Sequence, residues 1–259
     1  MSWGDKLSDM ELVYGPIQSL RYGSTLGINL LGSSKVCSYN CVYCHLGPTQ
    51  LTMNKVRKEY AFPSLDDLRD AFRHYIKQSV EIDAVVISGN GEPTLYPHFE
   101  EAMRMLVELR DEHIPGKRLV ILSNGAHLDT KKVVTGMNLL DERVIKVDAG
   151  NDALMQKIND PLVRINMAKF LSGVHKLNDC VVQALFVEGE GANTAPEALD
   201  DWMEVIGMIK PKDVQLCTLT RPSWHNGVRA VNDDMLDGIA FKLKKRNGLE
   251  SHVFSTKKS

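Results

Sequence analysis

The chain has 259 residues, of which 43% are hydrophobic and 25% are charged, and its net charge is −2 at neutral pH. This composition is typical of a globular protein with a large core, and the near-neutral charge gives no general attraction to nucleic acid or to a membrane surface. The sequence has no run of 18 apolar residues, so it predicts no membrane-spanning helix. The charged N-terminus lacks an apolar signal segment. We therefore expect a cytoplasmic protein.

The predicted elements alternate between strands and helices along the chain. A first helix is expected from Ser64, an N-cap followed by the acidic residues Asp66 and Asp67. Strands are expected at 82–89, 118–125, 143–150, 180–189, 213–220 and 251–255, and the later helices around 99–110 and at 128–140, 164–178, 196–209 and 232–246. This order predicts βαβ units with a parallel sheet, which could be an open doubly wound sheet or a full or partial barrel. Because no linker interrupts the pattern, we expect one α/β domain.

Polar residues follow several predicted strands, where α/β proteins place their sites. The carboxyl ends of parallel strands meet at one edge of the sheet. The polar groups stand at 89–92, 123–125, 146–148 and 218–221. We expect the functional site at this edge.

Three of the five cysteines, Cys37, Cys41 and Cys44, lie within eight residues. In a reducing compartment this clustering favours metal binding over disulfides. Thiolates select zinc or iron–sulfur clusters. A structural zinc ion needs four protein ligands, so the fourth would be His45 or a distant residue. His45 directly follows Cys44, and adjacent residues cannot easily chelate one ion. A [4Fe–4S] cluster held by three thiolates would keep one iron open for a small molecule. Three buried structural thiols and a zinc site are the alternatives.

These cysteines form the pattern C-x₃-C-x-aromatic-C, which resembles the cluster loop of the radical S-adenosylmethionine (AdoMet) superfamily. Further matches follow in order: "SGNGEPTL", "LSNG", "KVDAG" and "VVQALFVEG" at the ends of successive predicted strands. The segments "YGPIQSLRYGSTLGINLL" and "TLTRP" resemble a branch of iron–sulfur oxidoreductases related to the wyosine-base-forming enzymes of tRNA modification.

The resemblance spans roughly residues 14–255. It implies a partial (β/α)₆ TIM-like barrel of parallel strands. Residues 1–259 would form a single core domain, with the cluster loop at 33–47 and a short N-terminal extension at 1–13.

The resemblance also implies the chemistry. The three cysteines would hold a [4Fe–4S] cluster, and its open iron would bind the amino and carboxylate groups of AdoMet. One electron from the cluster would cleave AdoMet to methionine and a 5′-deoxyadenosyl radical, which removes hydrogen from the substrate. An electron donor such as flavodoxin or ferredoxin would reduce the cluster.

Residues near the cysteines and at the ends of the predicted strands 82–89 and 118–125 are the first candidates for AdoMet binding. Tyr43 would pack near adenine or be a half-buried loop aromatic. Glu92 would accept hydrogen bonds from the AdoMet ammonium. The backbone of its neighbours would approach the ligand: Gly89, Asn90 and Gly91. Ser123 and Asn124 would bind the carboxylate or the ribose. The alternative for these residues is ordinary turn formation.

Lys146, Asp148 and Gln183 lie in later strands and are further candidates. Lys146 and Asp148 point to one face of their strand. Asp148 would accept a ribose hydroxyl and Lys146 would pair with a carboxylate, or the two would form an internal ion pair. Gln183 would contact substrate or adenine, or satisfy a core neighbour.

The candidates for substrate chemistry are Arg21, Gln183, Cys217 and Arg221. Each guanidinium would suit a carboxylate or phosphate of the substrate, and the alternative is a structural salt bridge. Cys217 could quench or relay a radical, or be a core residue. Cys180 is interpreted as a core residue.

A different class of function remains open, namely a non-catalytic iron–sulfur or zinc protein that acts as a redox partner or scaffold. Such a carrier needs no AdoMet pocket. For an enzyme, the substrate could be a small metabolite, a peptide or protein side chain, or a nucleoside. No membrane partner is expected, and the charge does not favour nucleic acid.

Overall fold

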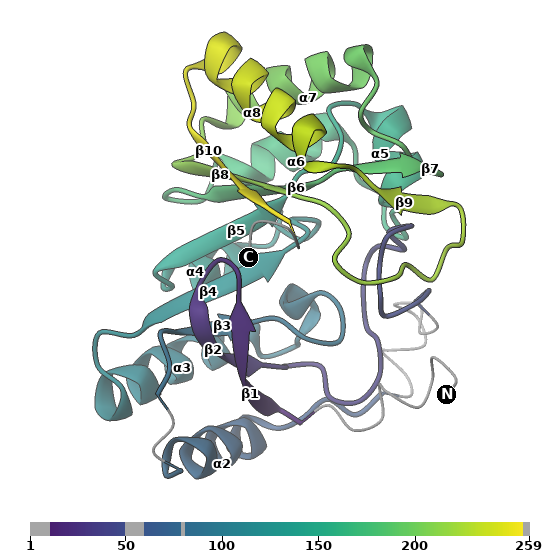
Figure 1. Cartoon of the computed structure of the whole chain (residues 1–259). Coiled ribbons are helices and arrows are strands. Elements are labelled where there is room, and N and C mark those ends of the chain that lie inside the picture. The colour runs from purple at the N-terminus through teal and green to yellow at the C-terminus, as the bar shows by residue number, and fades with distance from the viewer. Residues whose placement is uncertain (1–10, 50–59, 79–80, 256–259) are drawn as a thin grey trace. The chain divides into compact units, whose positions relative to one another are not determined.

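The computed structural model describes residues 11–49, 60–78 and 81–255. Contacts between residues divide this part of the chain into two compact units. The first unit contains the described residues of 1–38, 49–123 and 127–143, and the second contains those of 39–48, 124–126 and 144–259. Both units are layers of strands and helices (Figure 1).

The first unit is built on four neighbouring strands. These are β1 (Val13–Ser19), β2 (Gly23–Ile28), β3 (Ala84–Ile87) and β4 (Arg118–Ser123). β1 pairs with β2 in the antiparallel direction, whereas β2, β3 and β4 are parallel, with Thr25 opposite Ala84 and Ala84 opposite Arg118. All four residues of β3 are buried, as expected for a central parallel strand.

Helices α2 (Leu65–Ile76), α3 (Phe99–His113) and α4 (Lys131–Asn138), with the short 3₁₀ helix η1 (Pro93–Leu95), complete the first unit. Ser64 caps α2 as the sequence predicts, because its hydroxyl accepts from the Asp67 amide while the Asp67 carboxylate accepts from the Ser64 amide. α3 buries one face at three- and four-residue spacing, which includes Phe99, Met103 and Leu106.

The second unit contains the later parallel strands. They run in the order β5 (Glu142–Lys146, from Val144 onward in this unit), β6 (Val181–Leu185), β8 (Asp213–Cys217) and β10 (Ser251–Phe254). β7 (Val187–Gly189) and β9 (Val228–Ala230) form a separate antiparallel pair. The helices are α5 (Asp152–Ile158), α6 (Met167–Val174), α7 (Pro196–Ile209) and α8 (Asp233–Asn247).

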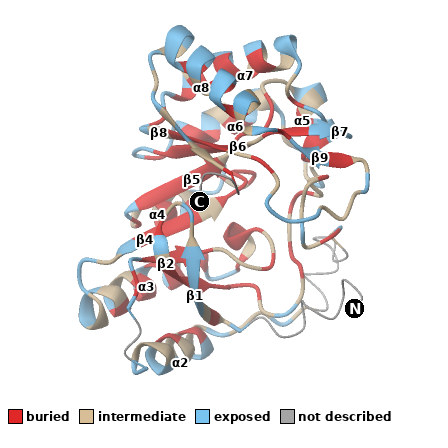
Figure 2. Ribbon diagram, viewed as in Figure 1, coloured by how far each residue is buried: buried red, intermediate tan, exposed pale blue. Residues whose placement is uncertain are grey.

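A large aromatic contact anchors the core of the second unit. Phe186 and Trp202 are almost fully buried and meet edge to face, with ring centroids 5.2 Å apart. The Trp202 indole N–H donates to the Val147 carbonyl at 2.9 Å, so α7 is tied to the end of β5. Figure 2 shows buried residues along β6 and β8, and exposed residues on the outer faces of α7 and α8.

The predicted alternation of strands and helices is confirmed, with local corrections. The helix expected at 164–178 is the shorter α6, and α5 was not predicted. The strand expected at 180–189 is two strands, because the chain turns away after Leu185 so that Val187 pairs with Ala230 of β9 instead of continuing beside β8.

The antiparallel β1–β2 hairpin was not given bounds from the sequence. The sequence also predicts a single domain, which stays a prediction. Of the predicted N-terminal extension, residues 1–10 lie outside the described part. Across the described ranges, none of the helices has the length and apolar character needed to cross a bilayer.

Candidate functional site

The segment that leads into the first cysteine is fixed to the end of β3 within the first unit. The Val36 amide donates to the Asn90 carbonyl at 2.9 Å, and the Glu92 amide donates to the Val36 carbonyl at 2.9 Å. These two bonds make a parallel bridge between Val36 and Gly91. The predicted cluster loop therefore starts beside the predicted AdoMet motif 89–92.

Glycine is required at both glycine positions of this motif. Gly89 and Gly91 have φ values of +144° and +131°. A Cβ atom on Gly91 would lie 1.9 Å from the Val36 carbonyl oxygen, and one on Gly89 would lie 2.7 Å from the Asn29 side chain. The motif therefore needs glycine at both positions, because the Val36 backbone and the Asn29 side chain occupy the space that a Cβ atom would take.

Asn90 is fully buried between the two glycines. Its Nδ2 donates to the Gly32 carbonyl at 2.7 Å, and its backbone amide donates to Asn29 Oδ1 at 3.3 Å. Its Oδ1 atom is buried and finds no hydrogen-bond donor among the described residues. A buried acceptor of this kind normally has a partner, and the AdoMet-binding role of Asn90 stays a prediction.

Glu92 is buried and organises the rest of the motif. Its Oε1 accepts from Thr94 Oγ1 at 2.7 Å, from the Thr94 amide at 3.2 Å and from Ser123 Oγ at 2.8 Å. The carboxylate thus caps η1 and joins the ends of β3 and β4. In the second unit, Asn124 Oδ1 accepts from the Ala126 amide at 3.0 Å, which is the turn-forming alternative. The AdoMet-binding roles of Glu92, Ser123 and Asn124 stay predictions.

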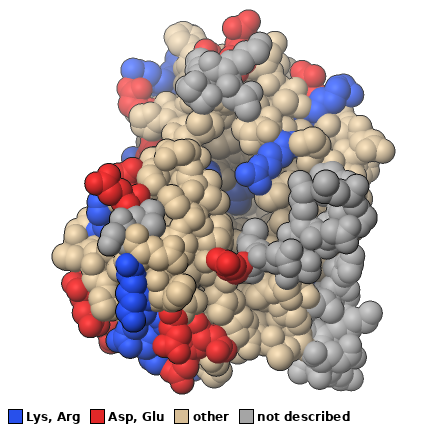
Figure 3. All heavy atoms as spheres, turned by 60° about the horizontal axis from the view of Figure 1, so that its bottom comes forward, with Lys and Arg blue, Asp and Glu red and all other residues tan. Residues whose placement is uncertain are grey.

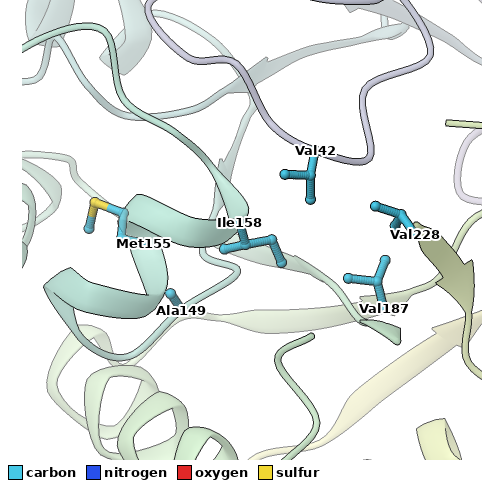
Figure 4. Packing of buried hydrophobic residues seen from close by; sticks show 6 residues of the cluster. All are labelled: Val42, Ala149, Met155, Ile158, Val187 and Val228. Carbon is cyan, nitrogen blue, oxygen red and sulfur yellow. The ribbon is translucent and has the colours of Figure 1, made fainter. Parts of the chain in front are cut away.

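In the second unit, the cysteine loop is held by the end of α5 through its backbone. The Asn40 amide donates to the carbonyls of Asn159 and Asp160 at 3.1 and 3.0 Å, and the Val42 amide donates to the Ile158 carbonyl at 2.9 Å. Figure 4 shows Val42 directed into a buried apolar cluster with Ile158, Val187 and Val228. Burial of Val42 therefore anchors the loop between Cys41 and Cys44.

The loop that follows β8 holds the cysteine loop through two further bonds. Trp224 Nε1 donates to the Cys41 carbonyl at 3.1 Å, and the Ser223 hydroxyl donates to the Val42 carbonyl. Together with α5, these bonds hold the carbonyl of Cys41 and both the amide and the carbonyl of Val42.

Asp148 is the hub of the polar groups around the loop, and its side chain is fully buried. Oδ1 accepts from the Leu185 amide at 2.8 Å and pairs with Lys146 Nζ at 3.1 Å. Oδ2 accepts from Asn159 Nδ2 at 2.8 Å and from the Tyr43 hydroxyl.

Lys146 and Asp148 thus form the internal ion pair that was the alternative to AdoMet binding. Lys146 Nζ also lies 5.0 Å from the centroid of the Tyr43 ring. The AdoMet-binding roles predicted for Tyr43, Lys146 and Asp148 stay predictions.

Burial and the charge of Asp148 control the protonation of the loop. Burial raises the pKa of the Cys41 thiol to about 11, and the Asp148 carboxylate adds to this rise. The same two causes hold the pKa of Tyr43 well above its usual value. Without a metal, both groups therefore keep their protons at neutral pH.

The donor set fits an iron–sulfur cluster in its chemistry. Cys37, Cys41 and Cys44 form no disulfide and are residues of intermediate exposure, and thiolates are the usual protein ligands of such clusters. Within the described ranges, no three Cys, His, Asp or Glu side chains are gathered as a metal site. His45, the nearest candidate for a fourth zinc ligand, is exposed. The fit rests on the three thiols themselves.

The candidates for substrate chemistry differ in their surroundings. Gln183 is buried, and its Nε2 donates to Gln215 Oε1 at 3.0 Å, so it satisfies a core neighbour on β8. Cys217 ends β8 with intermediate exposure, and Cys180 is buried as expected. Arg21 lies with its guanidinium carbon 5.9 Å from the Tyr22 ring centroid, and Arg221 is exposed. Their roles in catalysis stay predictions.

Three residues around the cysteine loop were missed from the sequence: Asn159, Ser223 and Trp224. None belongs to the strand-end motifs, and their importance comes from tertiary contacts. The Asn-Asp-Pro sequence at 159–161 does indicate a helix end, but nothing local indicates that this end meets Cys41.

Comparisons with known proteins identify the family of the chain. The sequence profile of the Radical SAM superfamily matches residues 32–201, which include the cysteine loop and the 89–92 motif. A UPF0026 protein of Synechocystis is 31% identical over 211 residues, which cover 81% of this chain and 76% of that protein. A protein of Brachyspira hyodysenteriae named GTPase Obg is 29% identical over 87% of this chain, but the match spans only 32% of that protein.

A solved structure of TYW1 with a lysine–pyruvate adduct has a similar fold. Its TM-score is 0.66 at 16% identity, and the match covers 95% of this chain and 82% of that one. This similarity confirms the predicted α/β fold of the partial-barrel type. Members of the superfamily are enzymes that use an iron–sulfur cluster and AdoMet. Because the family profile covers more than half of the chain and the Synechocystis relative matches most of both proteins, the chain belongs to the radical SAM superfamily of enzymes and to the UPF0026 family.

Proposed function

We propose that this enzyme binds a [4Fe–4S] cluster through Cys37, Cys41 and Cys44 and leaves one iron open for AdoMet. The observation that carries the proposal is the fixed cysteine loop. Its backbone is bonded to α5 and to the loop after β8, and Val42 anchors it in the apolar cluster. A loop fixed in this way can present three thiolates without a fourth protein ligand.

The cofactor supplies the reactive species, and the protein binds and orients it. When bound, the reduced cluster would provide the electron that cleaves AdoMet to methionine and a 5′-deoxyadenosyl radical. The radical would take a hydrogen atom from the substrate, which gives 5′-deoxyadenosine and a substrate radical.

Within the first unit, we assign AdoMet binding to the 89–92 motif. The two glycines let the segment that leads to Cys37 pack directly against the motif, which supports a ligand site beside the cluster. Asn90 Oδ1, which has no donor among the described residues, and the buried Glu92 carboxylate are acceptors suited to an ammonium group.

The substrate class is left open among small metabolites, peptide or protein side chains, and nucleosides. On the face drawn in Figure 3, acidic and basic side chains are intermixed over the described residues, which does not favour a long nucleic acid. A low-potential donor such as flavodoxin or ferredoxin is the expected reductant.

The decisive experiment is anaerobic reconstitution of the wild-type chain, followed by AdoMet and dithionite. We expect about four irons per chain, an electron paramagnetic resonance (EPR) signal of a reduced [4Fe–4S] cluster, and 5′-deoxyadenosine detected by chromatography. A protein that binds iron but yields no 5′-deoxyadenosine would be a non-catalytic carrier, and the proposal would be wrong.

The matched variants are Cys41→Ala and Cys180→Ala. Cys180 is a buried thiol outside the loop, so its replacement controls for the loss of a thiol from the core. We expect Cys41→Ala to lose the cluster signal and 5′-deoxyadenosine formation, while Cys180→Ala retains both. Retention of the cluster in Cys41→Ala would contradict the ligand assignment.

A further inference from the structure

Asn159 is placed at the cysteine loop by the end of α5. It is the C-cap residue of this helix, and its amide donates to the Met155 carbonyl at 2.9 Å. Its own carbonyl accepts from the Asn40 amide at 3.1 Å. Because both the amide and the carbonyl of this buried residue are hydrogen-bonded, its backbone is fixed next to Cys41.

The side-chain amide of Asn159 makes three close approaches. Its Nδ2 lies 2.8 Å from Asp148 Oδ2, 3.4 Å from Tyr43 Oη and 3.5 Å from Cys41 Sγ. An amide nitrogen carries two N–H groups. One donates to the Asp148 carboxylate, and the other is available to the Cys41 sulfur.

The orientation of this amide follows from its neighbours. An ionised carboxylate only accepts hydrogen bonds, and Asp148 is paired with Lys146 at 3.1 Å. The amide oxygen therefore cannot face Asp148, and the nitrogen must. The same choice puts an N–H donor, and not a carbonyl oxygen, beside the sulfur of Cys41.

We infer that Asn159 is a positioning residue that donates an N–H···S hydrogen bond to the Cys41 thiolate and thereby raises the reduction potential of the cluster. The inference rests on the proposed function, because it needs a cluster at Cys41. Hydrogen bonds to the ligand sulfurs are among the factors that set the potential of such clusters. Reduction adds negative charge to the iron and its thiolates, so the donor stabilises the reduced form more than the oxidised form.

The charged side chains around Asn159 explain why an N–H donor is needed beside the Cys41 sulfur. The Asp148 carboxylate and the Cys41 sulfur both lie near Asn159 Nδ2, at 2.8 and 3.5 Å, so the negative charge of the carboxylate is close to the thiolate. Lys146 offsets that charge from the opposite oxygen, Oδ1. Asn159 donates one N–H to Asp148 and presents the other to the sulfur, so its amide dipole offsets the negative charge of the carboxylate on the side of the cluster.

The test is a potentiometric titration of the reconstituted cluster, followed by EPR, in wild type, Asn159→Ala and Asn166→Ala. Asn166 is a matched control because it is an asparagine in the same unit that caps α6 by accepting from the Lys169 amide. For Asn159→Ala we expect a tenfold lower ratio of reduced to oxidised cluster at a fixed potential, which is a shift of about 59 mV to more negative values. We expect no shift for Asn166→Ala.

A second variant, Asn159→Leu, keeps a similar side-chain volume and has no N–H donor for the sulfur. It should show the same negative shift, and it serves if Asn159→Ala does not fold. A wild-type potential retained in both variants, or an equal shift in Asn166→Ala, would overturn this inference while the proposed function stands. A wild-type chain without a reducible cluster would overturn both.

Discussion

The buried hub at Asp148 provides the sharpest test of the second unit's energetics. We consider Asp148→Asn, which keeps the size of the side chain and removes its charge. The carboxylate has four neighbours that donate hydrogen bonds or carry positive charge: the Leu185 amide, Lys146, Asn159 and Tyr43. The substituted amide has one oxygen and one NH₂ group, so in either orientation its NH₂ faces two of these neighbours.

The magnitude follows from these contacts. Leaving buried hydrogen-bonding groups unsatisfied costs about 1–3 kcal/mol each, and removal of one partner of a buried ion pair costs about 3–5 kcal/mol. These terms overlap, because Lys146 is itself one of the four neighbours. We therefore expect Asp148→Asn to reduce the free energy of unfolding by about 4 kcal/mol. For a chain of this size, that loss lowers the melting temperature by roughly 10 °C.

The assay is thermal and denaturant unfolding of the cluster-free protein under reducing conditions, monitored by circular dichroism. Asp179→Asn is the control, because Asp179 and Lys212 form an ion pair at 4.0 Å in the same unit with side chains 46% and 40% exposed. An exposed pair of this kind contributes about 0–1 kcal/mol. Equal, small effects of the two substitutions would refute the reasoning that Asp148 is a buried hub.

Two further predictions concern the first unit. Gly91→Ala should destabilise the chain by about 2 kcal/mol more than Gly116→Ala in denaturant unfolding. Both glycines have positive φ, but only at Gly91 would the Cβ meet backbone, 1.9 Å from the Val36 oxygen. Equal losses of stability in the two variants would contradict this. Burial raises the pKa of Tyr96 to about 12 from an ordinary value near 10, with smaller contributions from Asp67 and Glu101. The phenol of the unfolded chain therefore ionises first, so stability falls as pH rises from about 10 to about 12. Tyr96→Phe should show a smaller fall over this range, and an identical fall would show that Tyr96 does not cause it.

Much of the fold follows from local patterns. Ser64, with Asp67 three residues later, predicts the start of α2 because the capping box is a purely local arrangement. The helix predicted at 196–209 coincides with α7, which begins at Pro196 and has a strong apolar face. The break after Leu185 could not be predicted, because it depends on pairing with β9, more than 40 residues later.

The site divides in the same way. The cysteine spacing and the strand-end motifs are local signals, so they could be read from the sequence. The contacts of Asn159 and Trp224 with Cys41 join residues separated by 118 and 183 positions. Neither residue has an unusual local sequence, and so their proximity to the cysteine loop required the fold.

Asp148 shows why a correct choice of residue can still leave its role undecided. The sequence predicts an acidic group at the end of β5 and offers two uses for it, a ribose acceptor or an internal ion pair. Both uses compete for the same two oxygens, which have about four acceptor positions in total. In the structure, four neighbours already occupy them.

A ribose hydroxyl would therefore bind to Asp148 only if one of these neighbours moved away. The Leu185 amide belongs to the backbone, and Asn159 is fixed by the end of α5, so Tyr43 and Lys146 are the two that could move by side-chain rotation alone. Tyr43 belongs to the cysteine loop, and Lys146 Nζ lies 5.0 Å from the centroid of the Tyr43 ring. Binding of AdoMet at Asp148 would thus change the contacts of Tyr43 and Lys146 first.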